Sequence, residues 1–202
     1  MRLVMTTGFL RRSLLAALAV GTFQVSSLTQ TAPDWVQPPS RHFPVVGGNL
    51  GNQRHSMLRQ IDRSTVSRVG GAWMVHLEDG STIGNMQATP VIVDGVMYIT
   101  TGPNNVFALD AATGAIKWKY QSQAKAGALT NRGVVVAEGK VFSAQRDNSL
   151  IALDQGSGAM MWKTQLAEPG RGYTTAPAVY HAGLVYMGIA GGEYGVRGQF
   201  GA

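Results

Sequence analysis

The sequence contains no cysteine, and this absence excludes several kinds of chemistry at once. Disulfide bonds, thiolate metal sites, cysteine nucleophiles and a lipid-anchored N-terminal cysteine all require a thiol. The compartment must therefore be inferred from a targeting segment. The four histidines lack the regular spacing of metal ligands, so a histidine zinc site is not expected; they are His42, His55, His76 and His181.

Charged residues are scarce as well. They make up 14% of the 202 residues, against 45% hydrophobic residues, and this balance excludes a disordered chain. The formal net charge is +6, but Arg2, Arg11 and Arg12 lie in a segment that we expect to be removed. The rest contains no basic run interleaved with aromatic residues, so no nucleic-acid partner is expected. No phosphate-binding loop or dinucleotide fingerprint is present either.

The first 27 residues predict a secretory signal peptide. A basic start is followed by the apolar stretch 13–25 and by the small residues Ser26 and Ser27. The stretch is shorter than the roughly 20 residues that a membrane-spanning helix needs, and an uncleaved anchor is the alternative. The segment 28–40, whose later part is rich in proline and polar residues, predicts a linker, and 41–202 is the expected mature domain.

Glycine is abundant, with 26 residues, and the chain repeats itself with a period of 44. The element Ala-Leu-Asp-x-x-Thr/Ser-Gly-x-x-x-Trp begins at Ala108 and again at Ala152. The turn glycines have the same spacing, at Gly95, Gly139 and Gly183. A fixed period of this length is typical of stacked units that cannot bury their faces alone.

One unit predicts four short strands, at 89–93, 96–101, 106–109 and 115–120, joined by Asp-Gly and Thr-Gly turns. Four antiparallel strands per unit indicate a β-propeller blade, so the fold class is all-β, with about three blades. Trp118 and Trp162 are expected to lie flat between neighbouring blades. Trp73, 45 residues before Trp118, predicts the last strand of an earlier unit.

The repeated element resembles the blades of the pyrroloquinoline quinone (PQQ) dehydrogenases of the methanol/ethanol family. More specific stretches lie outside the repeat, at 47–56, 60–66, 87–90, 130–133, 174–177 and 191–198. The resemblance implies an eight-bladed propeller in the periplasm, with PQQ and Ca²⁺ or a lanthanide as cofactors. It also implies a small alcohol as substrate and a cytochrome c or another quinone as electron acceptor.

The same resemblance implies the site residues. Arg132 matches the position whose guanidinium contacts PQQ, and its planar fork suits a carboxylate or quinone oxygen. Thr175 matches a hydroxyl donor to a PQQ carboxylate. Glu193 matches the carboxylate that binds the metal, since hard cations prefer oxygen ligands. The segment whose backbone approaches the cofactor closely is matched by Ala190, Gly191 and Gly192.

The sequence also departs from the family pattern. Gln87 stands where the family usually has a glutamate that is hydrogen-bonded to the cofactor. Ala126 and Gly127 stand where many members have adjacent cysteines over the cofactor face, so that lid is absent. Arg197 lies in the stretch that contains Glu193, and a surface ion pair between them is the alternative to a role at the site.

Three further parts of the family site match no residue here: the aspartate base, the other metal ligands and the tryptophan beneath the cofactor. We therefore expect the 202-residue chain alone to be inactive. One alternative is a non-enzymatic propeller scaffold of the outer-membrane assembly type. Another is a decayed or split gene product without activity.

Overall fold

The computed structural model describes residues 36–78, 85–125 and 130–202. The predicted signal peptide and the first part of the predicted linker lie outside the described residues, as do Ala126 and Gly127. The described residues form strands and two short 3-10 turns, η1 (Val66–Arg68) and η2 (Gly192–Tyr194), with no α-helix. No helix among them has the length and apolarity to cross a membrane.

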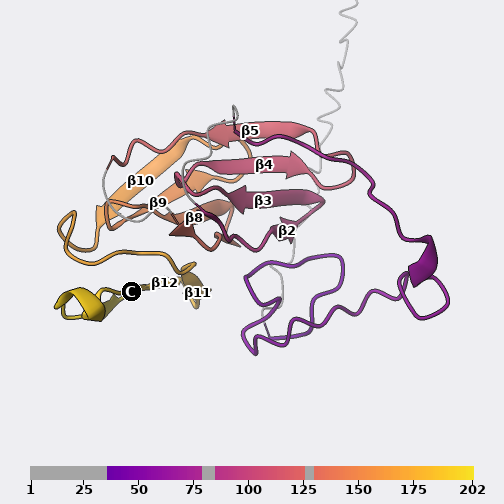
Figure 1. Cartoon of the computed structure of the whole chain (residues 1–202), viewed down its shortest axis with the longest axis horizontal. Helices are drawn as coiled ribbons and strands as arrows, with labels where there is room; N and C mark the ends of the chain where they lie inside the picture. Colours follow the sequence, from indigo (N-terminus) through magenta and orange to yellow (C-terminus); the bar gives the residue numbers. More distant parts are fainter. Residues whose placement is uncertain (1–35, 79–84, 126–129) are drawn as a thin grey trace, which may run out of the picture. The chain divides into compact units, whose positions relative to one another are not determined.

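Two four-stranded antiparallel sheets confirm the predicted blades (Figure 1). Blade 1 consists of β2 (Val91–Val93), β3 (Val96–Thr100), β4 (Val106–Asp110) and β5 (Ile116–Tyr120). Blade 2 consists of β7 (Val135–Ala137), β8 (Lys140–Ala144), β9 (Ser149–Asp154) and β10 (Met160–Gln165). In both blades the strands pair in sequence order, which is the expected meander.

A third sheet contains β11 (Val179–His181), β12 (Leu184–Ile189) and β13 (Gln199–Gly201), also in sequence order. We call these strands blade 3. The inner strands β2, β7 and β11 are neighbours, so the three blades stand side by side. A short parallel pair, β1 (Asn85–Met86) with β6 (Thr130–Asn131), joins the segments that precede blades 1 and 2.

The first three strands of blade 2 are buried on both faces, whereas its fourth strand, β10, is exposed along its whole length. Side chains that alternate along a strand point to opposite faces of the sheet. Val134 and Val136 belong to the hydrophobic cluster shared with blade 1. Their neighbours Val135 and Ala137 belong to a second cluster, which contains Met187 of blade 3. The first three strands of blade 2 therefore carry largely apolar side chains on both faces, as expected for strands between two other sheets.

Trp118 docks on the next blade, as the sequence predicts. The Trp118 indole N–H donates to the Gln155 carbonyl at 3.1 Å, and the ring lies against Gly158. Trp73 makes the same contacts one period earlier, with the Ala111 carbonyl at 3.2 Å and with Gly114. Each stack thus ties the end of one unit to a turn of the following blade.

For Trp162 the docking stays a prediction. Its side chain is 37% exposed, and its ring lies near Phe142, with 5.8 Å between ring centroids. The period is interrupted in blade 3, where the link between the second and third strands spans 190–198 instead of 101–105 or 145–148. A turn equivalent to that of Gly158 would follow β13 (Gln199–Gly201), beyond the residues that the structure describes.

An aspartate closes each docking turn. The Asp110 carboxylate accepts bonds from the Ala112 and Thr113 amides and from the Thr113 hydroxyl, at 2.9–3.0 Å. Asp154 does the same with Gly156 and Ser157. The hydroxyl bond is the main reason that the pKa of each aspartate lies below its ordinary value. These bonds consequently stabilise the turns above the pKa of an unfolded aspartate, and the effect is lost as the pH falls through the lowered pKa.

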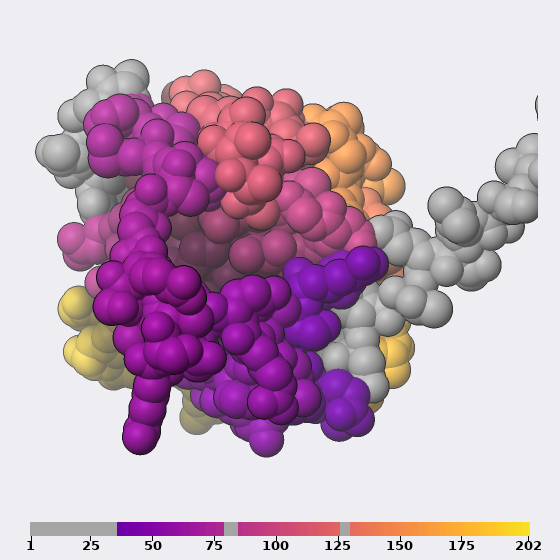
Figure 2. Space-filling view, turned by 90° about the vertical axis from the view of Figure 1, so that its right-hand side faces the viewer, coloured from indigo at the N-terminus to yellow at the C-terminus, as the bar shows by residue number. Residues whose placement is uncertain are grey.

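The opening segment packs on the inner strands. Phe43 exchanges two backbone hydrogen bonds with Ile92 of β2, at 2.7 and 2.9 Å. Val45 joins the cluster between blades 2 and 3, while Val46 packs on the cluster between blades 1 and 2. Figure 2 shows this segment, in indigo to purple, on the face of the molecule next to blade 1.

Substituting the docking glycine tests the stack. A Cβ on Gly158 would lie 2.6 Å from Trp118 Cε3, whereas one on Gly139 meets nothing within 4 Å, at almost the same φ of +70°. Gly139→Ala should cost about 1 kcal/mol of unfolding free energy through its left-handed backbone. Gly158→Ala should cost about 1–3 kcal/mol more through overpacking. Urea unfolding followed by tryptophan fluorescence measures both, and equal costs would contradict the docking contact.

Candidate functional site

The candidate residues lie at the same end of the blades. In an antiparallel meander, the link between the second and third strands emerges at the end where the last strand passes to the next blade. Gln87, Arg132 and Thr175 precede the inner strands of blades 1, 2 and 3. Glu193 lies in the link between the second and third strands of blade 3. The topology therefore collects four segments, far apart in sequence, at one rim.

A ladder of backbone hydrogen bonds fixes three of these segments to one another. The Thr89 amide donates to the Arg132 carbonyl at 3.2 Å, and the Arg132 amide donates to the Thr175 carbonyl at 3.0 Å. In the parallel pair, Met86 lies opposite Asn131, so Gln87 and Arg132 are the next residues along each strand. The positions before successive blades are thus held in register.

The side chains of Arg132 and Thr175 meet at this rim. Arg132 Nη1 donates to Thr175 Oγ1 at 2.5 Å, between residues 43 apart in sequence. Arg132 is exposed and Thr175 is half-buried. A fixed guanidinium beside a hydroxyl provides donors for the oxygens of an anion. The structure brings the two residues together, and their contact with a cofactor stays a prediction.

Asn131 holds the backbone beneath Arg132. Its amide nitrogen donates to the Ala144 carbonyl at 2.9 Å. Its amide oxygen accepts from the Thr100 hydroxyl and from the Gly133 N–H, both at 2.9 Å. The side chain is buried, so these bonds cannot be replaced by water without opening the rim.

The two adjacent threonines before blade 3 have different partners. Thr174 is buried and donates its hydroxyl to the Gln145 carbonyl of blade 2 at 2.7 Å. Thr175, the next residue, carries the hydroxyl that meets Arg132. This arrangement anchors the segment through Thr174 and leaves Thr175 at the site. The sequence reasoning singled out Thr175 alone.

Glu193 lies in η2, at the surface of blade 3, and it accepts a hydrogen bond from the Tyr173 hydroxyl. This bond is the main reason that the pKa of the carboxyl lies below its ordinary value, so the carboxylate stays ionised at neutral pH. The same bond raises the pKa of Tyr173, and the charge of Arg132 acts in the opposite direction.

The expected alternative of an ion pair between Arg197 and Glu193 is wrong. Among the ion pairs of the described residues, none joins these two side chains, and the partner of Glu193 is Tyr173. Both Arg197 and Gln87 are exposed. The Gln87 side chain makes no hydrogen bond to another described residue, so only its position in register connects it with Arg132.

The donor set suits a flat polyanion such as PQQ. Arg132 supplies a cation and Thr175 a hydroxyl, and Gly192 has an exposed backbone. Gly191 is buried against Gly172, so its approach to a cofactor stays a prediction. For a hard cation, Glu193 supplies one carboxylate. The described residues contain no cluster of three or more His, Cys, Asp or Glu side chains, so the role of Glu193 as a metal ligand stays a prediction.

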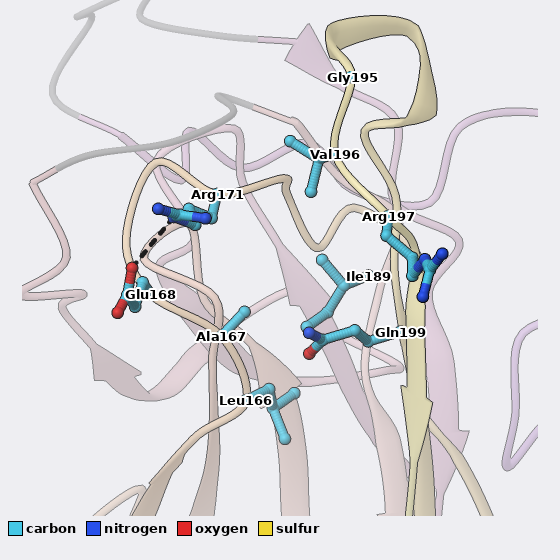
Figure 3. Close-up of a pocket in the computed structure, with 9 residues that line it drawn as sticks. All are labelled: Leu166, Ala167, Glu168, Arg171, Ile189, Gly195, Val196, Arg197 and Gln199. Atoms are coloured by element: carbon cyan, nitrogen blue, oxygen red, sulfur yellow. Dashed lines mark ion pairs between the residues drawn. The ribbon is translucent and has the colours of Figure 1, made fainter.

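A pocket of about 670 Å³ adjoins the Glu193 segment (Figure 3). Glu168 and Arg171 form an ion pair of 3.1 Å on one side, and the Arg197 side chain lies on the other. None of the residues predicted for the site from the family resemblance lines this pocket. The lining consists of Leu166, Ala167, Glu168, Arg171, Ile189, Gly195, Val196, Arg197 and Gln199.

Comparisons with known proteins agree on one family. A family model described as "PQQ: Glucose/ethanol/alcohol dehydrogenase, beta-propeller domain" matches residues 43–161. The chain is 38% identical over 195 residues to quinohemoprotein alcohol dehydrogenase ADH IIB of Pseudomonas putida, which covers 91% of this chain and 26% of the relative. The chain thus spans about a quarter of that relative's length.

Solved structures give the same result. The quinohemoprotein alcohol dehydrogenase of Comamonas testosteroni superposes with a TM-score of 0.71 at 34% identity, over 78% of this chain and 24% of that one. A europium-containing methanol dehydrogenase superposes with a TM-score of 0.69 at 31% identity, over 79% of this chain and 29% of that one. These similarities extend the predicted propeller architecture to most of the chain.

Substitutions at two neighbouring residues should distinguish a residue that stabilises the fold from one that belongs to the site. Asn131→Ala leaves buried donors and acceptors unpaired and should lower the free energy of unfolding by about 1–3 kcal/mol. Arg132→Ala removes an exposed side chain and should change it by less than about 0.5 kcal/mol. Chemical denaturation of both variants beside the parent chain measures the difference. A loss at Arg132 as large as that at Asn131 would show that the arginine braces the fold.

Proposed function

The chain belongs to the family of glucose/ethanol/alcohol dehydrogenase β-propeller domains, and we propose that it forms the first blades of a periplasmic PQQ-dependent alcohol dehydrogenase. The observation that carries the proposal is the contact between Arg132 and Thr175. These residues come from successive blades, match cofactor positions of the family and meet at the rim that also bears Glu193.

Each residue has a defined task in this proposal. Arg132 and Thr175 bind and orient the oxygens of the cofactor. The segment of Ala190, Gly191 and Gly192 lets its backbone approach the ring, and Glu193 gives one oxygen ligand to Ca²⁺ or a lanthanide. Gln87, in register with Arg132, offers an amide donor that does not repel a carboxylate.

Bound PQQ would supply the two-electron oxidation of a small alcohol by hydride transfer, with the metal as Lewis acid. The base that takes the alcohol proton matches no residue of this chain, so we propose that residues 1–202 alone are inactive. A cytochrome c or another quinone is the proposed electron acceptor. The periplasmic location is proposed from the N-terminal segment.

Cofactor binding and turnover test this proposal separately. The 202-residue chain should show no dye-linked alcohol oxidation with PQQ and Ca²⁺, because the base is missing. A polypeptide that continues through the remaining blades should bind PQQ and turn over ethanol. In that polypeptide Arg132→Ala and Thr175→Val should each weaken PQQ binding by about tenfold or more, the equivalent of one charge-assisted hydrogen bond.

Equilibrium dialysis followed by quinone absorbance measures the affinity. Lys117→Ala, on the exposed strand β5, is the matched control for the loss of a surface cation. Turnover by the 202-residue chain would contradict its proposed inactivity. Unchanged PQQ affinity in both site variants would contradict the assignment of Arg132 and Thr175.

A further inference from the structure

Tyr173 lies at the centre of the contacts around Glu193, although the sequence analysis did not single it out. Its hydroxyl donates to Glu193 Oε1, between residues 20 apart in sequence. Its backbone is fixed to the same loop, because Tyr173 and Ala190 exchange two hydrogen bonds of 3.0 Å each. The backbone of Tyr173 is therefore already bonded to the segment that carries Glu193, and the ring extends from this fixed position.

Two glycines allow this close approach. A Cβ on Gly172 would lie 2.4 Å from the Ala190 carbonyl oxygen, and one on Gly191 would lie 2.9 Å from the Gly172 Cα. Both contacts involve backbone atoms, which cannot rotate away as a side chain can. With φ values of +77° and +134°, both positions also need the conformational freedom of glycine. These two glycines thus allow the segment around Tyr173 and the loop that carries Glu193 to lie in direct contact.

The loop itself is closed by short-range bonds. The Tyr194 and Val196 amides both donate to the Gly191 carbonyl, at 2.9 and 3.2 Å. The Tyr194 ring meets the Tyr173 ring edge-on, with 6.0 Å between centroids at 65°. Glu193 therefore lies between a closed turn and the phenol of Tyr173, and one carboxylate oxygen carries the hydroxyl bond.

We propose that Tyr173 is a positioning residue, whose hydroxyl holds one oxygen of Glu193 against blade 3 and thereby presents the other oxygen to a hard cation. The geometric part depends only on the contacts of blade 3, whereas the cation rests on the proposed function. Ligand carboxylates are commonly hydrogen-bonded in this way, and loss of such a partner typically lowers metal affinity by about 10–100-fold.

The chain contains a matched control. Tyr180 also donates its hydroxyl to a glutamate, Glu138, but at the turn between β7 and β8. That turn lies at the opposite end of blade 2 from the link 145–148. Tyr180→Phe therefore removes the same kind of bond without touching the candidate site, together with the bond of 3.1 Å that the Gly183 N–H donates to the Tyr180 hydroxyl.

Hydrogen–deuterium exchange on the 202-residue chain tests the positioning. Tyr173→Phe should speed the exchange of the Tyr194, Gly195 and Val196 amides several-fold, with the melting temperature little changed. Tyr180→Phe should leave these amides unaffected. In the Glu193→Ala background the effect of Tyr173→Phe should vanish, whereas in Glu193→Gln, which keeps an acceptor oxygen, it should persist. Identical exchange in Tyr173→Phe and the parent chain would overturn the proposal.

Tb³⁺ luminescence, sensitised by the nearby phenol rings, is the second readout. It is measured on the polypeptide that continues through the remaining blades, because a lone carboxylate is too little to bind the ion tightly. Tyr173→Phe should weaken Tb³⁺ binding by about tenfold or more, while Tyr180→Phe should not. Equal Tb³⁺ affinity in Tyr173→Phe and the parent chain would overturn the presentation of a free oxygen. If exchange shows the coupling but Tb³⁺ binds neither protein, Tyr173 positions Glu193 as proposed, and the metal role in the proposed function is what fails.

Discussion

The stacking of a tryptophan on a glycine turn of the next blade sets how far apart successive blades can lie. Trp118 fits against Gly158 because glycine has no Cβ. A Cβ at that position would lie only 2.6 Å from the indole ring. Its N–H also bonds to the Gln155 carbonyl, so both the distance and the rotation of the next blade are fixed. With that spacing, each inner strand lies beside the next, and the backbone ladder through Thr89, Arg132 and Thr175 can form.

The candidate site is a consequence of this stacking at one rim. A single blade offers one connector and one link there, which is too little to surround a ligand. Three blades in register place a guanidinium, a hydroxyl and a carboxylate on neighbouring segments. The repeat supplies the architecture, and the residues that interrupt it, above all those of 190–198, supply the chemistry.

The sequence predicted the parts that follow a period. The strands of blade 1 agree with the prediction to within two residues at every end, and Trp118 docks as expected. Trp73 docks in the same way, but residues 71–77 form no strand, so the strand predicted there is wrong. The docking of Trp162 stays a prediction, because the longer link of blade 3 shifts the matching turn beyond the residues that the structure describes. A repeat period predicts contacts between residues at equivalent positions of successive blades. It cannot predict the contacts of a segment such as 190–198, which has no counterpart of the same length in blades 1 and 2.

Contacts between loops could not be predicted in the same way. Tyr173 and Glu193 meet through an unrepeated distance of 20 residues, and no pattern identifies such a pair. Arg197, nearer in sequence to Glu193, seemed the natural partner and is not. Gly172 and Gly191 were a usable signal, since glycines outside the turn positions often mark a close backbone approach. The buried side chains of Asn131 and Thr174 hydrogen-bond to segments that meet only in the folded protein. No spacing in the sequence predicts these bonds.

The central claim is that Arg132, Thr175 and Glu193 belong to one cofactor site. A crystal structure with PQQ and Ca²⁺, of a polypeptide that continues through the remaining blades, tests it most directly. The account predicts density for the quinone against Arg132 and Thr175, with the metal at Glu193. Quinone density in the pocket beside Arg171 and Arg197, with Arg132 still bonded only to Thr175, would contradict it.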